Sequence, residues 1–147
     1  MKHNVAIEIR EAEDGPRLHG VILQEGRAAA GGRAEVFAPG SVIWPDSGIE
    51  IRTKHLQPSE VRAMPVRQPD GRIAVAVKAT PEIVSAVRGG RSSMSVEFEA
   101  LREVRTAGGV REIQRAYVDA AALTMPSRAE YSQTAAEVRS RRPAVWL

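Results

Sequence analysis

The 147-residue sequence contains no cysteine, and its three histidines are scattered along the chain. The absence of cysteine excludes disulfides, thiolate catalysis and zinc–thiolate sites. His3, His19 and His55 lie far apart, and none belongs to a pair with the spacing of metal ligands. The sequence therefore predicts a protein that needs neither a metal nor another cofactor.

Aromatic residues make up only 4% of the chain, and its net charge of +3 comes from interspersed charges. A basic stripe with interleaved aromatics is missing, which argues against nucleic-acid binding. No apolar run approaches the roughly 20 residues that span a bilayer. The first residues lead into an alternating pattern and not into a signal-peptide core. We therefore expect a soluble, intracellular protein with no nucleic-acid or membrane partner.

Most of the chain consists of short segments that alternate apolar and polar residues, as half-buried β-strands do. The strand candidates are residues 5–9, 18–23, 34–37, 41–44, 49–51, 61–66, 73–77, 94–98 and about 110–125. Turn signals separate several of them, most clearly Asp14-Gly15-Pro16, Pro69-Asp70-Gly71 and Gly108-Gly109. The pattern predicts an opening hairpin made by segments 5–9 and 18–23, and a second hairpin around residue 70.

Two helices are expected beside the strands. Thr80-Pro81-Glu82 offers a capping hydroxyl, a proline at the first helical position and an acid in the first turn, and Gly89-Gly90 ends the helix. Ser127 and Glu130 form a capping-box pattern that predicts a final helix over about 127–141. The fold class is therefore mainly β (α+β), as one domain over residues 1–147. We expect a small, mainly antiparallel β-barrel or curled sheet with peripheral helices.

Ser95 is the candidate nucleophile. It alternates with Met94 and Val96 in a strand, behind a glycine pair that lets the backbone approach closely. A hydroxyl attacks well only when a base takes its proton, and His55 has the neutral-range pKa that this role needs. The alternatives are a cross-strand surface serine and a structural histidine.

Asp119 is the candidate third residue. It interrupts the otherwise apolar segment 117–126, where a carboxylate is costly to bury unless it is paired. In a triad it would orient His55 and stabilise the imidazolium. The alternatives are a carboxylate that faces water and a structural ion pair with Arg115.

The segment Met94-Ser95-Val96-Glu97-Phe98 is similar to a Leu-Ser-Ile-Gly-Phe type of motif, and other segments match in the same order. Together they resemble the tailed-phage prohead protease family, serine peptidases that mature viral capsids and share a fold with the herpesvirus assemblins. The resemblance covers most of the chain, from Leu18 to about Tyr131. The other matching segments are Leu18-His19-Gly20, 35–41, His55, Pro65, Asp70-Gly71 and 118–127.

Glu97 and Asp119 are the main departures from the family pattern, and Ala120 and Ser127 are mild ones. Glu97 stands where the family usually has glycine; its charge would lower activity, contact substrate, or mark a relative that has lost catalysis. Asp119 replaces the usual glutamate and is one methylene shorter, so its reach to His55 is reduced.

The resemblance implies a serine endopeptidase that works through an acyl-enzyme, with Ser95, His55 and Asp119 as catalytic residues. Its expected substrates are the major capsid protein and scaffold segments, cleaved inside the assembling procapsid in the host cytoplasm. Backbone N–H groups near Gly89-Gly90, or Arg128, are the candidate oxyanion donors. The alternative is a catalytically inactive capsid-assembly module on the same fold. Self-association is left open.

Overall fold

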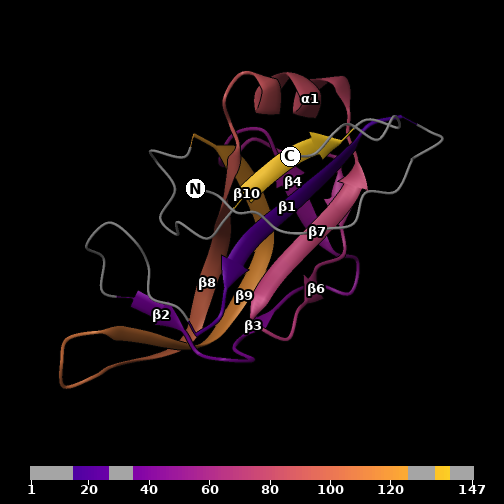
Figure 1. The fold of residues 1–147 in the computed structure, drawn as a ribbon. Helices are drawn as coiled ribbons and strands as arrows, with labels where there is room; N and C mark the ends of the chain where they lie inside the picture. The colour runs from indigo at the N-terminus through magenta and orange to yellow at the C-terminus, as the bar shows by residue number, and fades with distance from the viewer. Residues whose placement is uncertain (1–14, 27–34, 126–134, 140–147) are drawn as a thin grey trace.

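The computed structural model describes residues 15–26, 35–125 and 135–139, which form ten strands and one helix (Figure 1). The elements are β1 (Arg17–Gln24), β2 (Glu35–Phe37), β3 (Val42–Ile43), β4 (Ile49–Arg52), β5 (Arg62–Ala63), β6 (Val66–Arg67), β7 (Arg72–Lys78), α1 (Pro81–Arg88), β8 (Ser93–Arg105), β9 (Arg111–Thr124) and β10 (Ala135–Arg139). The predicted mainly β class is confirmed. In these residues no helix has the length and apolar character needed to cross a bilayer.

The strands form two sheets. The first has the order β10-β1-β7-β6 and is antiparallel throughout. The second is built around β9, which pairs antiparallel with β8 along one edge and parallel with β2, β3 and β4 along the other. β5 adds to β4 at the far side.

The two sheets do not close into a barrel, so the predicted barrel is wrong. The antiparallel prediction holds for the first sheet, whereas the second is mixed. Alternation of apolar and polar residues identifies a strand and its buried face, but it is blind to the strand's partner and direction. In the second sheet, the partner and the direction are set by β9, which pairs in parallel with the short strands β2, β3 and β4.

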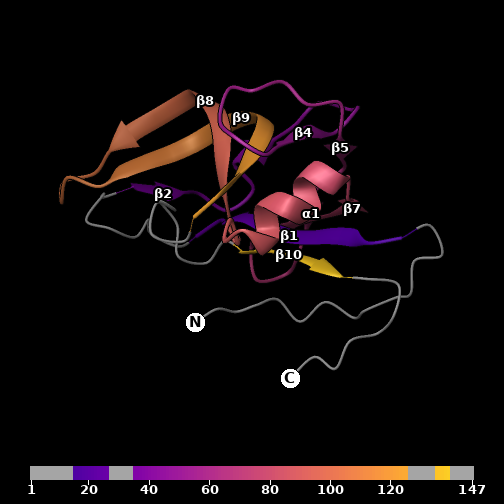
Figure 2. The ribbon, with the colours of Figure 1, turned by 90° about the horizontal axis from the view of Figure 1, so that it is seen from above.

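The core lies between the sheets, and α1 covers one end of it (Figure 2). Ile83 is the buried residue of the helix. The rings of Phe37 and Phe98 meet edge to face with centroids 5.0 Å apart, which joins β2 to β8 through the core. The largest fully buried apolar side chains are Phe37, Leu18, Ile22, Leu23, Ile49, Ile51, Ile73, Ile83, Met94, Ile113 and Leu123.

The helix predicted after Thr80 is confirmed. The Thr80 hydroxyl accepts a hydrogen bond from the Ile83 amide at 3.2 Å, and Pro81 occupies the first turn. The second predicted helix is wrong over residues 135–139, which form β10 on the edge of the first sheet. There, pairing with β1 outweighs the local capping signal. The rest of that range, 127–134 and 140–141, lies outside the described residues.

Segment 61–66 is two strands instead of the predicted one. β5 belongs to the second sheet and β6 to the first, so the chain crosses between sheets at Met64-Pro65. Pro65 has no N–H to donate to a ladder, which favours a break there. The hairpin around residue 70 is confirmed between β6 and β7. In the opening hairpin, segment 5–9 lies outside the described residues, and the described partners of β1 are β7 and β10.

A buried carboxylate joins the two sheets where β1 ends. The Glu25 side chain is 2% exposed and accepts hydrogen bonds from the amides of Gly40 and Val42 at 2.9 and 3.0 Å. The guanidinium of Arg67 donates to both Glu25 oxygens and lies over the Trp44 ring, 5.2 Å from its centroid. Burial alone would raise the pKa of Glu25, but the hydrogen bonds from Arg67 and the two amides lower it below 4.5.

Gly90, in the turn between α1 and β8, has a backbone that favours glycine. Its φ is +111°, and a Cβ there would lie 3.3 Å from the Met125 sulfur. We expect Gly90→Ala to lower the free energy of unfolding by about 1–2 kcal/mol. Gly108→Ala is the matched control, because a Cβ at Gly108 meets nothing within 4 Å. Equal urea midpoints for the two variants would contradict this account of the turn.

Candidate active site

The candidate site lies on one face of the second sheet, where β4, β9 and β8 run side by side. The register places Glu50, Ala120 and Glu97 in one row across the three strands. Arg52, Ala122 and Ser95 form the neighbouring row in the same way. Paired residues point to the same side of a sheet, so both rows share a face. The intervening row, Ile51, Ala121 and Val96, packs on the core.

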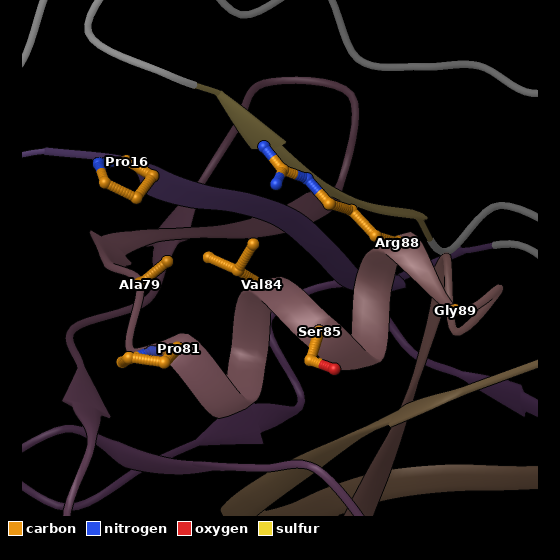
Figure 3. A pocket seen from close by; sticks show the side chains of 7 residues that line it. All are labelled: Pro16, Ala79, Pro81, Val84, Ser85, Arg88 and Gly89. Atoms are coloured by element: carbon orange, nitrogen blue, oxygen red, sulfur yellow. The ribbon is translucent and has the colours of Figure 1, made fainter.

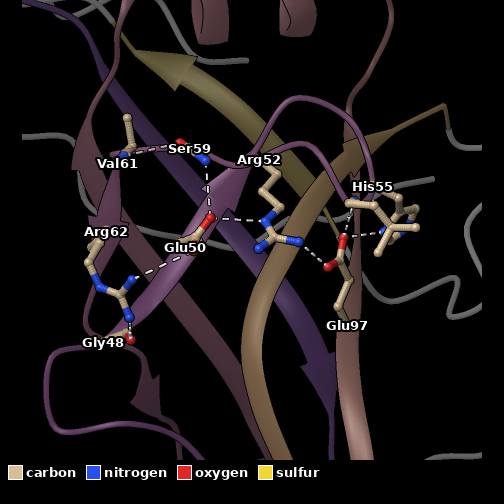
Figure 4. Close-up of polar contacts among 9 residues, drawn as sticks. Gly48, Glu50, Arg52, His55, Ser59, Val61, Arg62 and Glu97 are labelled. Atoms are coloured by element: carbon tan, nitrogen blue, oxygen red, sulfur yellow. Dashed lines mark hydrogen bonds and ion pairs between the residues drawn. The ribbon is translucent and has the colours of Figure 1, made fainter.

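A chain of ion pairs crosses this face (Figure 4). Arg52 Nη1 donates to Glu97 Oε1 at 2.5 Å, and its Nε donates to Glu50 Oε1 at 3.0 Å. The central strand contributes only the methyl groups of Ala120 and Ala122 to these rows, which leaves room for the long side chains above it. Arg52 therefore links its own strand to β8 across β9.

His55 joins this chain from the loop after β4. Its Nδ1 lies 2.7 Å from Glu97 Oε2, and the Leu56 amide donates to the same oxygen at 3.0 Å. The loop is also held where it returns, because the Ser59 amide donates to Glu50 Oε1 at 3.1 Å. The Glu97 carboxylate thus receives the guanidinium, the imidazole and a backbone amide. It fixes the ring that the sequence singled out as a base.

Leu56 has a strained backbone at the tip of this loop. Its φ is +66°, the left-handed region that costs a non-glycine residue about 1–2 kcal/mol. Its side chain is 81% exposed, so burial of the leucine does not offset that cost. The conformation aims its amide at Glu97. Backbone strain of this kind clusters at functional sites, and here it lies next to the candidate base His55.

The ion pairs of this face shift the pKa values of Glu50 and Arg52. The pKa of Glu50 is lowered, first by its hydrogen bond from Arg52 and next by the Ser59 amide. The pKa of Arg52 is raised, first by the hydrogen bond to Glu50 and, against partial desolvation, by the charges of Glu97, Glu50 and Asp119. Both shifts favour the charged forms of Glu50 and Arg52.

Ser95 lies on this same face, two residues before Glu97 on β8, and is half-buried. The fold thus brings β8 and the His55 loop together, as the sequence predicted. Among the described residues no hydrogen bond joins the Ser95 hydroxyl to His55, whose ring nitrogen contacts Glu97 instead.

Asp119 is exposed and occupies a β-bulge in β9. Glu97 pairs with Ala120 and Phe98 pairs with Val118, so Asp119 is the extra residue between them. Its charge acts on Arg52. In the described part of the chain no hydrogen bond or ion pair joins Asp119 to His55 or to Arg115, so its orienting role stays a prediction.

Sequence reasoning missed the partner of His55. It treated Glu97 only as a departure from a glycine motif and gave Arg52 no role. The available signal was the spacing: Glu97 is two residues from Ser95 and so must share its face of the strand. A carboxylate there can reach any base that reaches the serine.

The glycine pair offers no free donors for an oxyanion. The amides of Gly89 and Gly90 donate to the carbonyls of Ser85 and Val87, and the Arg91 amide donates to the Ala86 carbonyl. These bonds end α1. Arg128, the other candidate, lies outside the described residues.

One hollow lies away from these residues, beside α1. It is an open groove of about 710 Å³, lined by Pro16, Ala79, Pro81, Val84, Ser85, Arg88 and Gly89 (Figure 3). Two smaller hollows border the His55 loop. One of about 430 Å³ includes Thr53, Lys54 and Arg91, and one of about 390 Å³ includes Thr53, Gln57 and Pro58.

Within the described ranges, no three His, Asp or Glu side chains are grouped so that they could hold a metal ion. Comparison with protein-family models, curated proteins and solved structures finds no match.

Proposed function

We propose that this protein is a serine endopeptidase in which Ser95 is the nucleophile, His55 the general base and Glu97 the residue that orients the base. The observation that carries the proposal is the 2.7 Å contact between His55 Nδ1 and Glu97, two residues from Ser95 on one strand face. A carboxylate on Nδ1 fixes the tautomer whose Nε2 can accept a proton. Glu97 therefore takes the role that the sequence gave to Asp119.

The reaction follows from these roles. His55 Nε2 takes the Ser95 proton as the serine oxygen bonds to the peptide carbonyl carbon. The imidazolium then gives that proton to the leaving amine when the C–N bond breaks. Water, activated by the same nitrogen, hydrolyses the acyl-enzyme and restores Ser95. Glu97 accepts the hydrogen bond from Nδ1 and stabilises the imidazolium.

The spacing of the residues supports these roles. Residues two apart on a strand are separated by about 6.6 Å along it. A serine–imidazole–carboxylate relay contains two hydrogen bonds of about 2.8 Å each, plus the width of the ring. Such a relay separates the serine and carboxylate oxygens by about 8 Å, somewhat more than the backbone spacing, and the long Glu97 side chain can supply the difference when the Ser95 hydroxyl turns toward Nε2.

The substrate class follows from the resemblance to the prohead proteases. We propose that the protein cleaves scaffold segments and the major capsid protein inside an immature procapsid in the host cytoplasm, on an assemblin-like fold. The ordered set of motifs from Leu18 to about Tyr131 supports this assignment. The hollows that border the His55 loop are where substrate side chains would lie.

A serine-directed fluorophosphonate tests the nucleophile directly. We expect it to attach to Ser95 with one probe per chain, located by mass spectrometry of the digested protein. Ser93→Ala is the matched control, because it removes a hydroxyl from the same strand two residues away and keeps Ser95. It is expected to label normally. Ser95→Ala is expected not to label. Stoichiometric labelling of Ser95→Ala would exclude this residue as the nucleophile.

A non-catalytic capsid-assembly module is the second candidate. It is favoured by the completeness of the Glu97 contacts, which hold Arg52, His55 and Leu56 together without Ser95. On this reading the ion pairs only stiffen the loop. Such a module would leave the fluorophosphonate unreacted and a co-expressed capsid precursor intact, yet still associate with that precursor.

A further inference from the structure

Two arginines face each other on the distal part of the β8–β9 hairpin. Arg102 and Arg115 are direct cross-strand partners in the register, and both are exposed. Figures 1 and 2 show this end of the hairpin extending away from α1. Like charges directly opposite each other on a sheet are destabilising. The arrangement therefore weakens the hairpin unless something negative binds there.

The neighbouring arginines differ from this pair. Arg111 forms ion pairs with Glu35 and Glu103, the latter at 2.5 Å. Arg105 donates to the Gly109 carbonyl at 3.1 Å. Within the described ranges, neither Arg102 nor Arg115 has a carboxylate within 4.0 Å, and Glu103 is already engaged by Arg111. Two guanidinium groups are thus left to bind a negative partner.

A β-bulge lies on each side of the Arg102–Arg115 pair. Ala100 pairs with Ala116 and Arg102 with Arg115, so Leu101 is an extra residue on β8. Gln114 is an extra residue on β9 in the same way. Bulges on both strands redirect side chains and are frequent at functional positions. Here they isolate the arginine pair from the regular ladder.

Apolar side chains and a free strand edge accompany the charges. Leu101 and Val104 are 49% and 43% exposed. β8 pairs with β9, and no described strand occupies its other edge. Such an edge accepts an additional strand, with backbone hydrogen bonds giving affinity and side chains giving specificity.

We propose that Leu101, Arg102, Val104 and Arg115 form a docking surface for an extended, acidic and partly apolar segment of a partner protein. The segment adds to the β8 edge, its carboxylates bind the two guanidinium groups in paired N–H···O contacts, and its apolar side chains cover Leu101 and Val104. Exposed leucine and valine favour a protein over a nucleic acid, whose recognition uses stacking aromatics. This surface works independently of the serine chemistry.

The test uses the full chain carrying Ser95→Ala, so that binding is measured whether or not the protein is a peptidase. The probe is a fluorescein-labelled ten-residue peptide of alternating glutamate and leucine, followed by anisotropy at 0.15 M salt. We expect Arg102→Glu to weaken binding at least tenfold. Arg88→Glu, an exposed arginine on α1, is the matched control and is expected to change it less than twofold. An alternating lysine–leucine peptide is expected not to bind.

Arg102→Glu also separates binding from folding. It places a carboxylate opposite Arg115, so the melting temperature is expected to stay unchanged or rise while the peptide affinity falls. Equal affinities for the Arg102→Glu and Arg88→Glu proteins would overturn the proposal. So would a thymidine oligonucleotide that binds more tightly than the acidic peptide and displaces it, because the surface would then serve a nucleic acid.

Discussion

Glu97→Gln is expected to lower the cleavage rate constant by about 10⁴-fold, the size of effect seen when the orienting carboxylate of a serine-protease triad becomes an amide. The amide keeps the shape of Glu97, and its oxygen can still accept from the Arg52 guanidinium. Its NH₂ group, however, favours the His55 tautomer with the proton on Nε2, and it leaves the imidazolium without a counter-charge. The measurement is single-turnover cleavage of a co-purified capsid precursor, with fragments identified by mass spectrometry.

Asp119→Asn is the control that separates the two carboxylates. Because Asp119 is exposed in the β9 bulge and its charge acts on Arg52, we expect less than about a threefold change in the same rate constant. The reverse order, a large loss for Asp119→Asn and a small one for Glu97→Gln, would return the orienting role to Asp119. Both proteins should retain the thermal transition of the parent within a few degrees.

Glu25→Gln is expected to lower the free energy of unfolding by about 2–3 kcal/mol. The Glu25 side chain is 2% exposed and accepts from two amides and from Arg67. The substitution replaces an acceptor oxygen with a donor group that faces other donors, at a typical cost of 1–3 kcal/mol. Breaking a fully buried ion pair would cost more stability. Here the Arg67 side chain is 38% exposed, so water can solvate its guanidinium when Glu25 is replaced. The melting temperature should fall by about 5–10 °C.

The same carboxylate makes stability depend on pH in a defined direction. Hydrogen bonds lower the folded-state pKa of Glu25 below 4.5, so the unfolded chain binds the proton more tightly. Its contribution is therefore complete above about pH 4.5 and is lost as the pH falls through the lower folded-state pKa. Urea unfolding between pH 3 and 7 should show a flatter acid limb for Glu25→Gln than for Glu60→Gln, whose carboxylate is exposed. Parallel limbs would contradict this assignment.

Local signals in the sequence predicted elements well wherever local chemistry decides them. The cap at Thr80 predicted α1, and the Pro69-Asp70-Gly71 turn predicted the hairpin of β6 and β7. Prediction failed where distant pairing decides. The capping-box pattern at Ser127 indicated a helix through residues 135–139, which instead extend the first sheet beside β1. Neither the parallel pairing of β4 with β9 nor the sheet change at Pro65 has a local signal.

The candidate site was predictable in its residue types but not in its partnerships. Ser95 and His55 come to neighbouring elements, as their chemistry suggested. Asp119 attracted attention because an acid interrupts an apolar run, but a bulge turns that position to water. A bulge shifts the register by one residue, and alternation alone cannot locate it. Glu97 was interpreted as a departure from a glycine motif that would lower activity, contact substrate or mark lost catalysis, and its role as the partner of His55 was missed.

The central place of β9 has a consequence for how the molecule matures. Because β9 lies between β4 and β8, the loop that carries His55 cannot settle over β8 until residues 111–124 have left the ribosome. Partners this distant in the chain also make folding slow, since the cost of closing a long loop precedes any gain from pairing. A chain that ends before residue 111 is therefore expected to lack the contact between His55 and Glu97.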